Sequence, residues 1–171
     1  MFILIIGAKG GVGATSLAVN LAREMDGGVG LDLYDGQLAS QLERKVWALS
    51  GLAFSAGQQR QRAIDRIVKQ RISLLWTPEC NLAGESAWEI ARAVADRSTL
   101  VADGGIGEDP TPQASGIADV IVIVGNSSNV SRYHEARLQE QYPTAAVIGL
   151  DLNQSRHETR DAARELAAQL N

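Results

Sequence analysis

The chain contains only one cysteine, Cys80, among its 171 residues. A single thiol cannot form an internal disulfide bond, so the sequence fits a reducing compartment better than an oxidising one. No apolar stretch approaches the roughly 20 residues that a membrane-spanning helix needs. The apolar run at residues 2–6 is too short for a signal peptide and lacks a basic start. We therefore expect a cytoplasmic protein without an integral membrane segment.

The sequence also lacks internal repeats, low-complexity tracts and an excess of positive charge. Its formal net charge of −4 argues against a wholly basic nucleic-acid binder, although it does not exclude a local basic face. The hydrophobic content of 45% and the charged content of 21% are ordinary for a globular protein. A chain of this length can bury one sizeable core, so we expect a single domain over residues 1–171.

Apolar strand-like runs alternate with helix-like runs, which is typical of an α/β fold with a buried parallel sheet. Strands are expected near residues 2–7, 28–33, 72–76, 98–103, 119–125 and 145–151. Helices are expected over roughly residues 14–25, 37–49, 59–70, 85–96, 129–141 and 155–170. The pattern predicts a three-layer fold, in which helices flank a mostly parallel central sheet of about six strands.

The most informative segment runs from Gly7 to Ser16 and reads GAKGGVGATS. It follows an apolar run and precedes a helix-like run, and this context is typical of a phosphate-binding loop. Glycines let the backbone wrap around an anion, while loop N–H groups and the start of the next helix bind phosphate oxygens. A phosphate loop normally ends Gly-Lys-Thr, but here it reads Gly13-Ala14-Thr15.

The run from Lys9 to Gly13 resembles the deviant Walker A motif of the ParA/MinD superfamily of P-loop ATPases. The resemblance implies that ATP or ADP binds with Mg²⁺ and that ATP favours a homodimer. Lys9 matches the lysine that reaches the partner's nucleotide, and Thr15 matches the magnesium-binding hydroxyl. The nucleotide-binding residues that it implies in the loop are Gly10, Gly11, Val12, Gly13, Ala14, Thr15 and Ser16. Ala14 departs from the family pattern, which has a lysine at this position. In lacking that lysine, the loop is similar to the loop of the TadZ/CpaE-like branch, whose members localise pilus-assembly machinery.

Two acidic residues follow predicted strands, where ligands bind in open α/β sheets. Asp32 matches the first aspartate of the family's Asp-x-Asp element, which positions the attacking water or contacts the metal's water shell. Tyr34 stands where the second aspartate is common, and Asp35 is either a displaced acid or a helix cap. Asp103 resembles a Walker B aspartate that holds Mg²⁺ through water, although an aspartate can also simply open a glycine turn.

Asn153 follows the last predicted strand and resembles the asparagine with which the family reads the adenine edge. Its amide has both a donor and an acceptor, as adenine requires. The alternative is a turn or N-cap residue before the last helix.

The missing loop lysine predicts slow chemistry, because loss of a preorganised cation costs about 3 kcal/mol in the transition state. This corresponds to a rate loss of about a hundredfold or more. The leading hypothesis is an ATP-gated dimeric switch with weak hydrolysis, which positions pilus or secretion machinery or partitions DNA. The alternatives are a non-hydrolysing pseudo-ATPase scaffold and a small-molecule ligase or kinase, which Ala14 disfavours.

The segment from Arg60 to Arg71 is a candidate partner surface, because it carries five basic residues and one acid, Asp65. It indicates an acidic protein partner or nucleic acid, and the alternative is a solvated helix face. The segment has no interleaved aromatic residues, so its sequence gives nucleic-acid binding little support.

Overall fold

The computed structural model describes residues 1–106, 110–150 and 157–170. Its centre is a seven-stranded sheet in the order β3-β4-β2-β5-β1-β6-β7, and every strand pairing is parallel. The strands are β1 (Phe2–Gly7), β2 (Val29–Asp32), β3 (Val46–Ala48), β4 (Ser73–Leu75), β5 (Leu100–Asp103), β6 (Val120–Gly125) and β7 (Ala146–Gly149). The sheet confirms the predicted parallel α/β class.

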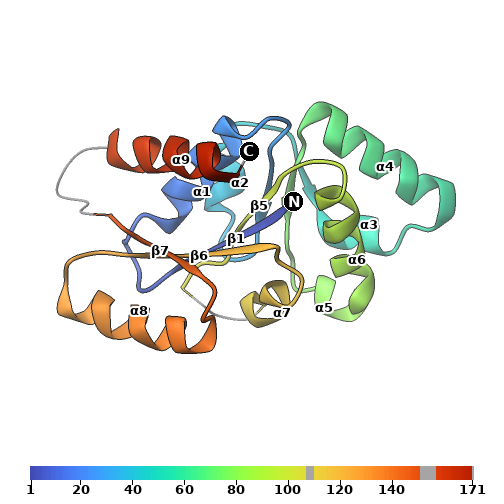
Figure 1. Ribbon diagram of the computed structural model, residues 1–171. Helices are drawn as coiled ribbons and strands as arrows, with labels where there is room; N and C mark the ends of the chain where they lie inside the picture. Colours follow the sequence, from blue (N-terminus) through green and yellow to red (C-terminus); the bar gives the residue numbers. More distant parts are fainter. Residues whose placement is uncertain (107–109, 151–156, 171) are drawn as a thin grey trace.

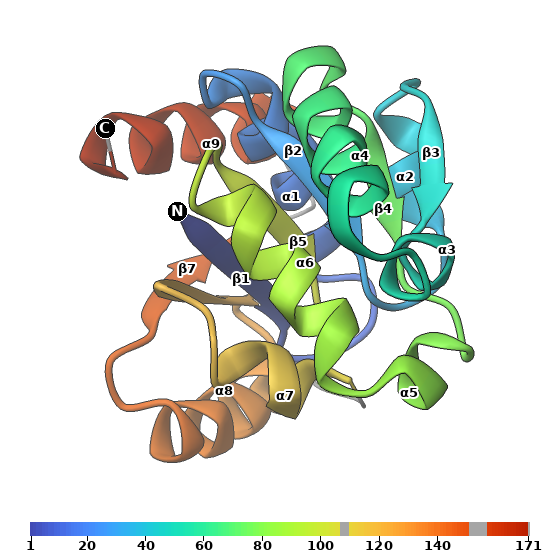
Figure 2. The ribbon, with the colours of Figure 1, turned by 90° about the vertical axis from the view of Figure 1, so that its right-hand side faces the viewer.

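Helices cover both faces of the sheet and complete the three layers (Figures 1 and 2). One face carries α1 (Ala14–Glu24), α2 (Gln37–Gln41) and α9 (His157–Leu170). The other carries α3 (Leu49–Ala53), α4 (Gly57–Gln70), α5 (Cys80–Ala83), α6 (Glu85–Ala95), α7 (Thr111–Ser115) and α8 (Asn129–Gln141). None of the helices in the described ranges combines the length and apolarity needed to cross a bilayer.

The central strand β1 divides the core, because successive strand side chains point to opposite faces. Ile3 and Ile5 pack in the cluster formed with α1 and α9. Phe2, Leu4 and Ile6 pack in the cluster formed with α6. All five side chains have no solvent exposure, so the strand is anchored on both sides. Packing on both faces of β1 therefore fixes the position of the loop that follows this strand.

The predicted helix over residues 37–49 is wrong in its second half. Helix α2 ends at Gln41, and Glu43 then adopts a left-handed backbone conformation with φ 53°. The residues that follow form β3, in which Val46 pairs with Ser73 of β4. The β-branched and aromatic side chains of Val46 and Trp47 suit a strand, and tertiary pairing has prevailed over helical continuation. This strand raises the sheet from the predicted six strands to seven.

Candidate phosphate-binding site

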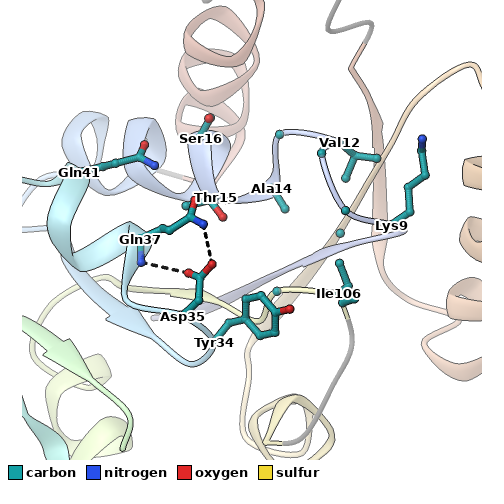
Figure 3. Close-up of a pocket in the computed structure, with 15 residues that line it drawn as sticks. Lys9, Val12, Ala14, Thr15, Ser16, Tyr34, Asp35, Gln37, Gln41 and Ile106 are labelled. Carbon is teal, nitrogen blue, oxygen red and sulfur yellow. Dashed lines mark hydrogen bonds between the residues drawn. The ribbon is translucent and has the colours of Figure 1, made fainter.

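A cavity of about 410 Å³ lies at the carboxyl edge of the sheet, where the β1–α1 loop meets the ends of β2 and β5 (Figure 3). The predicted loop forms most of its wall, and residues that follow β2 and β5 complete it. The lining residues are Gly7, Lys9, Gly10, Gly11, Val12, Gly13, Ala14, Thr15, Ser16, Tyr34, Asp35, Gln37, Gln41, Gly105 and Ile106. The structure thus brings together every loop residue that the sequence singled out.

The segment that follows β5, together with strand β6, holds the start of the loop. The Gly7 N–H donates to the Gly105 carbonyl at 2.7 Å, and the Ala8 N–H donates to the Val124 carbonyl at 2.8 Å. Further along, Gly11 and Gly13 adopt positive φ angles of 76° and 90°, which glycine reaches at little cost. The backbone can therefore turn sharply around the cavity and then enter α1.

The start of α1 faces this cavity without a protein cap. Its N-cap residue is Gly13, no side chain accepts a hydrogen bond there, and the first turn contains no acidic residue. The first N–H groups of a helix have no intrahelical partner, and they carry the positive end of the helix dipole. Thr15 and Ser16 in this turn are partly exposed. The arrangement suits a phosphate group.

Asp32 ends β2 but does not line the cavity. Its carboxylate is fully buried and accepts three backbone hydrogen bonds. Oδ1 accepts from the N–H groups of Tyr34 at 3.2 Å and Gly36 at 3.0 Å, while Oδ2 accepts from Ala39 at 3.1 Å. In this structure Asp32 therefore holds the turn between β2 and α2, and its catalytic role stays a prediction.

Asp35 stands at the start of α2 and on the cavity wall (Figure 3). It accepts hydrogen bonds from the Gln37 backbone N–H at 3.0 Å and from the Gln37 side-chain amide at 2.6 Å. These contacts resemble those of the predicted helix cap, although Gly36 is the N-cap residue itself. Gln37 and Gln41 were not predicted as lining residues. Their spacing of four residues, which places both on one helix face, could have indicated them.

Asp103 ends β5 in register with Asp32, is 1% exposed and, like Asp32, does not itself line the cavity, although Gly105 two residues later does. Its Oδ1 accepts a hydrogen bond from the Gly105 N–H at 3.1 Å, whereas its buried Oδ2 has no hydrogen-bond partner. Burial raises the pKa of Asp103. The Thr15 hydroxyl and the Gly105 N–H oppose this increase, and the charges of Asp32 and Asp35 add to it. The Thr15 hydroxyl lowers the pKa of this carboxyl group, but it makes no hydrogen bond to Oδ2.

The unpartnered oxygen of Asp103 fits a hydrated magnesium ion. Buried carboxylate oxygens normally have a partner, and Mg²⁺ bound beside phosphates keeps several waters that could supply one. The described residues contain no group of three or more acidic, histidine or cysteine side chains arranged for a metal. A phosphate-bound Mg²⁺ needs only one or two protein ligands, and Thr15 with Asp103 supplies that number.

Lys9 and Tyr34 lie on opposite sides of the cavity mouth (Figure 3). The Lys9 amine is directed away from Thr15 and Gln37, toward the outside of the loop. The Tyr34 ring covers Gly105, since a Cβ added to Gly105 would lie 2.6 Å from the Tyr34 Cγ. The Tyr34 side chain therefore packs on the backbone beside Asp103. Asn153 lies outside the described residues, so its predicted adenine contact stays untested.

Several solved structures resemble this chain, including the following three. The ParA family ATPase from Chlorobium tepidum TLS matches with a TM-score of 0.63 and 14% identity, covering 98% of this chain and 80% of that one. A chain of the MinC:MinD cell division protein complex of Aquifex aeolicus matches with a TM-score of 0.59 and 20% identity, over 86% and 66%. The MinD cell division protein of Aquifex aeolicus matches with a TM-score of 0.56 and 20% identity, over 87% and 67%.

No protein-family model matches the sequence. No curated protein matches it either. The structural likenesses, at such low identity, establish the fold alone. The molecule has the three-layer fold of P-loop nucleoside triphosphatases, in the arrangement found in ParA and MinD.

Proposed function

We propose that this protein is an ATP-binding switch that dimerises with ATP and positions a larger assembly. The observation that carries the proposal is the uncapped start of α1 inside a glycine-lined cavity, next to the unpartnered Oδ2 of Asp103. The likeness to ParA and MinD ATPases supports the same assignment, because the phosphate loop of P-loop proteins connects a strand to the helix that follows it.

The loop N–H groups and the start of α1 would hold the phosphates of ATP or ADP. Thr15 and Asp103 would hold Mg²⁺, which supplies positive charge to the phosphate oxygens when bound. Burial at Asp103 favours its protonated form, so an ion at this site competes with a proton. Asn153 is proposed to contact the adenine, as the sequence resemblance implies.

Two observations favour slow hydrolysis. The Ala14 methyl brings no charge to the phosphates, and the Asp32 carboxylate is already engaged by three backbone N–H groups. Asp32 would have to leave these donors unpaired before it could position a water molecule, which costs free energy. The same observations favour the second candidate, a scaffold that binds nucleotide without hydrolysing it.

The direction of Lys9 supports the dimer. An amine that points away from its own loop gives little stabilisation to phosphates bound there, but it can reach a nucleotide in a second subunit. We therefore propose that Lys9 acts across an ATP-dependent homodimer. Its charge then favours ATP binding to the dimer over the monomer, and this difference shifts the equilibrium.

The basic segment on α4 supplies a candidate surface for the assembly partner, but only part of it is free. Arg60 pairs with Glu89 at 3.6 Å, and Arg71 pairs with Asp26 at 3.3 Å. The exposed face of α4 retains Arg62, Arg66 and Lys69, for which no ion pair with a described residue is found. This face is proposed to contact an acidic protein or nucleic acid.

The indole ring of Trp47, in strand β3, lies next to this basic face. The Trp47 ring of β3 lies 5.4 Å from the Arg66 guanidinium carbon and 5.5 Å from the Lys45 Nζ. The basic segment therefore has an aromatic neighbour that its own sequence does not show. Cation–π contacts of this kind hold the two cations close to the ring.

Calorimetry and sedimentation test the switch together. We expect Mg²⁺-dependent ATP binding, with dimer formation in ATP at tens of micromolar protein. Lys9→Ala should weaken the dimer while the monomer keeps most of its affinity for nucleotide. Absence of ATP and ADP binding at millimolar ligand would contradict nucleotide binding, and a wild type that stays monomeric in ATP would contradict the homodimer.

The substitution Ala14→Lys tests the assignment of slow hydrolysis to the loop. An added ammonium at this position should reach the β- and γ-phosphates, and we expect up to about a hundredfold faster release of phosphate. Brisk hydrolysis by the wild type would show that the missing lysine matters little. An unchanged rate with intact ATP binding would instead assign the defect to the β2 end, at Asp32 or Tyr34.

A further inference from the structure

Two smaller cavities lie beside the phosphate cavity, near the carboxyl ends of β2 and β4. The first, of about 210 Å³, shares Tyr34 with the phosphate cavity. The second, of about 290 Å³, shares Trp76, Asn81 and Pro110 with the first. Each is smaller than the roughly 300–1,000 Å³ of a typical small-molecule pocket. The two cavities adjoin each other at these three residues, and we call the pair the tryptophan groove.

Stacked aromatic rings form the apolar part of this groove. Trp76, which follows β4, and Trp88 of α6 stack with ring centroids 4.2 Å apart and an interplanar angle of 28°. Both side chains are partly exposed. The neighbouring helix α5 presents Leu82, which is 82% exposed. Rigid, partly exposed indoles of this kind provide large contact area at a low cost in conformational entropy, and they are enriched at interaction hot spots.

The charged side chains described at the tryptophan groove are acidic. Neither cavity has a lysine, arginine or histidine among its described lining residues. Glu85 lines the second cavity, and Glu79 stands at the start of α5 beside Pro78. Both carboxylates are exposed, and no ion pair with a described residue is found for either. The Thr77 side chain lowers the pKa of Glu79, so this carboxylate stays charged to a lower pH than an ordinary glutamate does.

We propose that the tryptophan groove docks a short, extended and positively charged segment of a partner protein. Apolar side chains of the segment contact Trp76 and Trp88, and its arginine or lysine side chains pair with Glu79 and Glu85. The cations can also lie against the indole faces, which attract positive charge. The groove is separate from the basic face of α4, so it selects a partner surface of the opposite charge.

Fluorescence anisotropy tests this docking without nucleotide, so that its failure does not depend on ATP binding. The probe is a fluorescein-labelled peptide in which arginine, leucine and proline alternate. A matched peptide carries glutamate in place of arginine. We expect the basic peptide to bind wild type, and the acidic peptide to bind at least tenfold more weakly. Equal affinity for the two peptides, or no binding of the basic one, would overturn the proposal.

Matched charge variants separate docking from general attraction to an acidic protein. The double variant Glu79→Gln/Glu85→Gln should bind the basic peptide about fivefold more weakly, because it loses two surface ion pairs. The control Glu43→Gln/Glu140→Gln makes the same change in net charge at exposed residues that do not line the groove. Equal losses in the two double variants would overturn the proposal.

The aromatic contribution is tested by Trp88→Ala, for which we expect about tenfold weaker binding. Since this change also removes the stack with Trp76, circular dichroism checks that the variant is folded. Trp88→Phe provides a second, more conservative variant and should retain part of the affinity. Full affinity in a folded Trp88→Ala protein would contradict docking at these rings.

Discussion

Strands β2 and β5 end side by side with the same residue type, Asp32 in one and Asp103 in the other, and the two positions are paired in register. Both side chains are buried. The Asp32 carboxylate accepts three backbone N–H groups, so both of its oxygens are engaged. The Asp103 carboxylate accepts one, and its Oδ2 has no hydrogen-bond partner.

The difference arises from the chain that follows each strand. After Asp32, a glycine at position 36 with φ 81° turns the backbone into α2 and directs N–H groups back at the carboxylate. After Asp103, the backbone passes through Gly104 and Gly105 toward the phosphate loop, and one N–H group returns. The Asp32 carboxylate is therefore fully hydrogen-bonded within the fold, whereas the Asp103 carboxylate has one buried oxygen without a hydrogen-bond partner.

Among the substitutions that test the difference between the two aspartates, Asp32→Ala should have the largest effect. The change leaves three backbone N–H groups without their acceptor in a buried turn, so we expect the free energy of unfolding to fall by about 3 kcal/mol. Denaturant titration measures the loss, and Asp32→Asn, which keeps one acceptor oxygen, should lose less. A stable Asp32→Ala protein that loses only its ATP turnover would instead assign Asp32 to catalysis.

Asp103→Asn should have a smaller and opposite effect on stability. It removes a buried negative charge and its repulsion from Asp32 and Asp35, so we expect the free energy of unfolding to rise by about 1 kcal/mol without ligand. The same change should weaken Mg²⁺-dependent ATP binding about tenfold, which corresponds to about 1.4 kcal/mol. Calorimetry with and without Mg²⁺ measures this loss, and unchanged Mg²⁺ dependence would contradict the proposed metal role.

The pH dependence of stability sharpens the comparison further. Because burial raises the pKa of Asp103 in the folded protein, protonation of this group stabilises the fold. That contribution is fully present below the unfolded pKa of about 3.9 and is lost as pH rises through the folded pKa. The stability difference between Asp103→Asn and wild type should therefore grow as the pH is raised from about 4. A difference that shrinks with rising pH would contradict the assignment.

Much of the fold could be predicted from the sequence, because buried parallel strands are strongly apolar and glycines mark the joins. The loop from Gly7 to Ser16 was recognisable because its glycines follow an apolar strand-like run. Short elements were harder to predict. Helices α3 and α7 have five residues each, too few for a stable isolated helix, and they depend on tertiary packing. Strand β3 depends equally on its pairing with β4.

The loop residues that line the cavity could be named from the sequence, but Gln37 and Gln41 were missed, and the hydrogen-bonding state of each aspartate could not be predicted. A strand-end aspartate looks the same in a sequence whether its oxygens are engaged or free. The distinction between Asp32 and Asp103 depends on where later N–H groups return. The contact of Trp47 with Arg66 likewise joins β3 to α4. Such pairings come from tertiary structure, so neither segment indicates them alone.

Gly105 connects three parts of the molecule at one residue. Its carbonyl accepts the Gly7 N–H at the start of the loop, its N–H donates to Asp103, and the Tyr34 ring covers its α-carbon. Tyr34 in turn is a wall of both the phosphate cavity and the tryptophan groove. A ligand that moves this ring in one cavity reshapes the other. By thermodynamic reciprocity, each ligand then changes the other's affinity by the same factor.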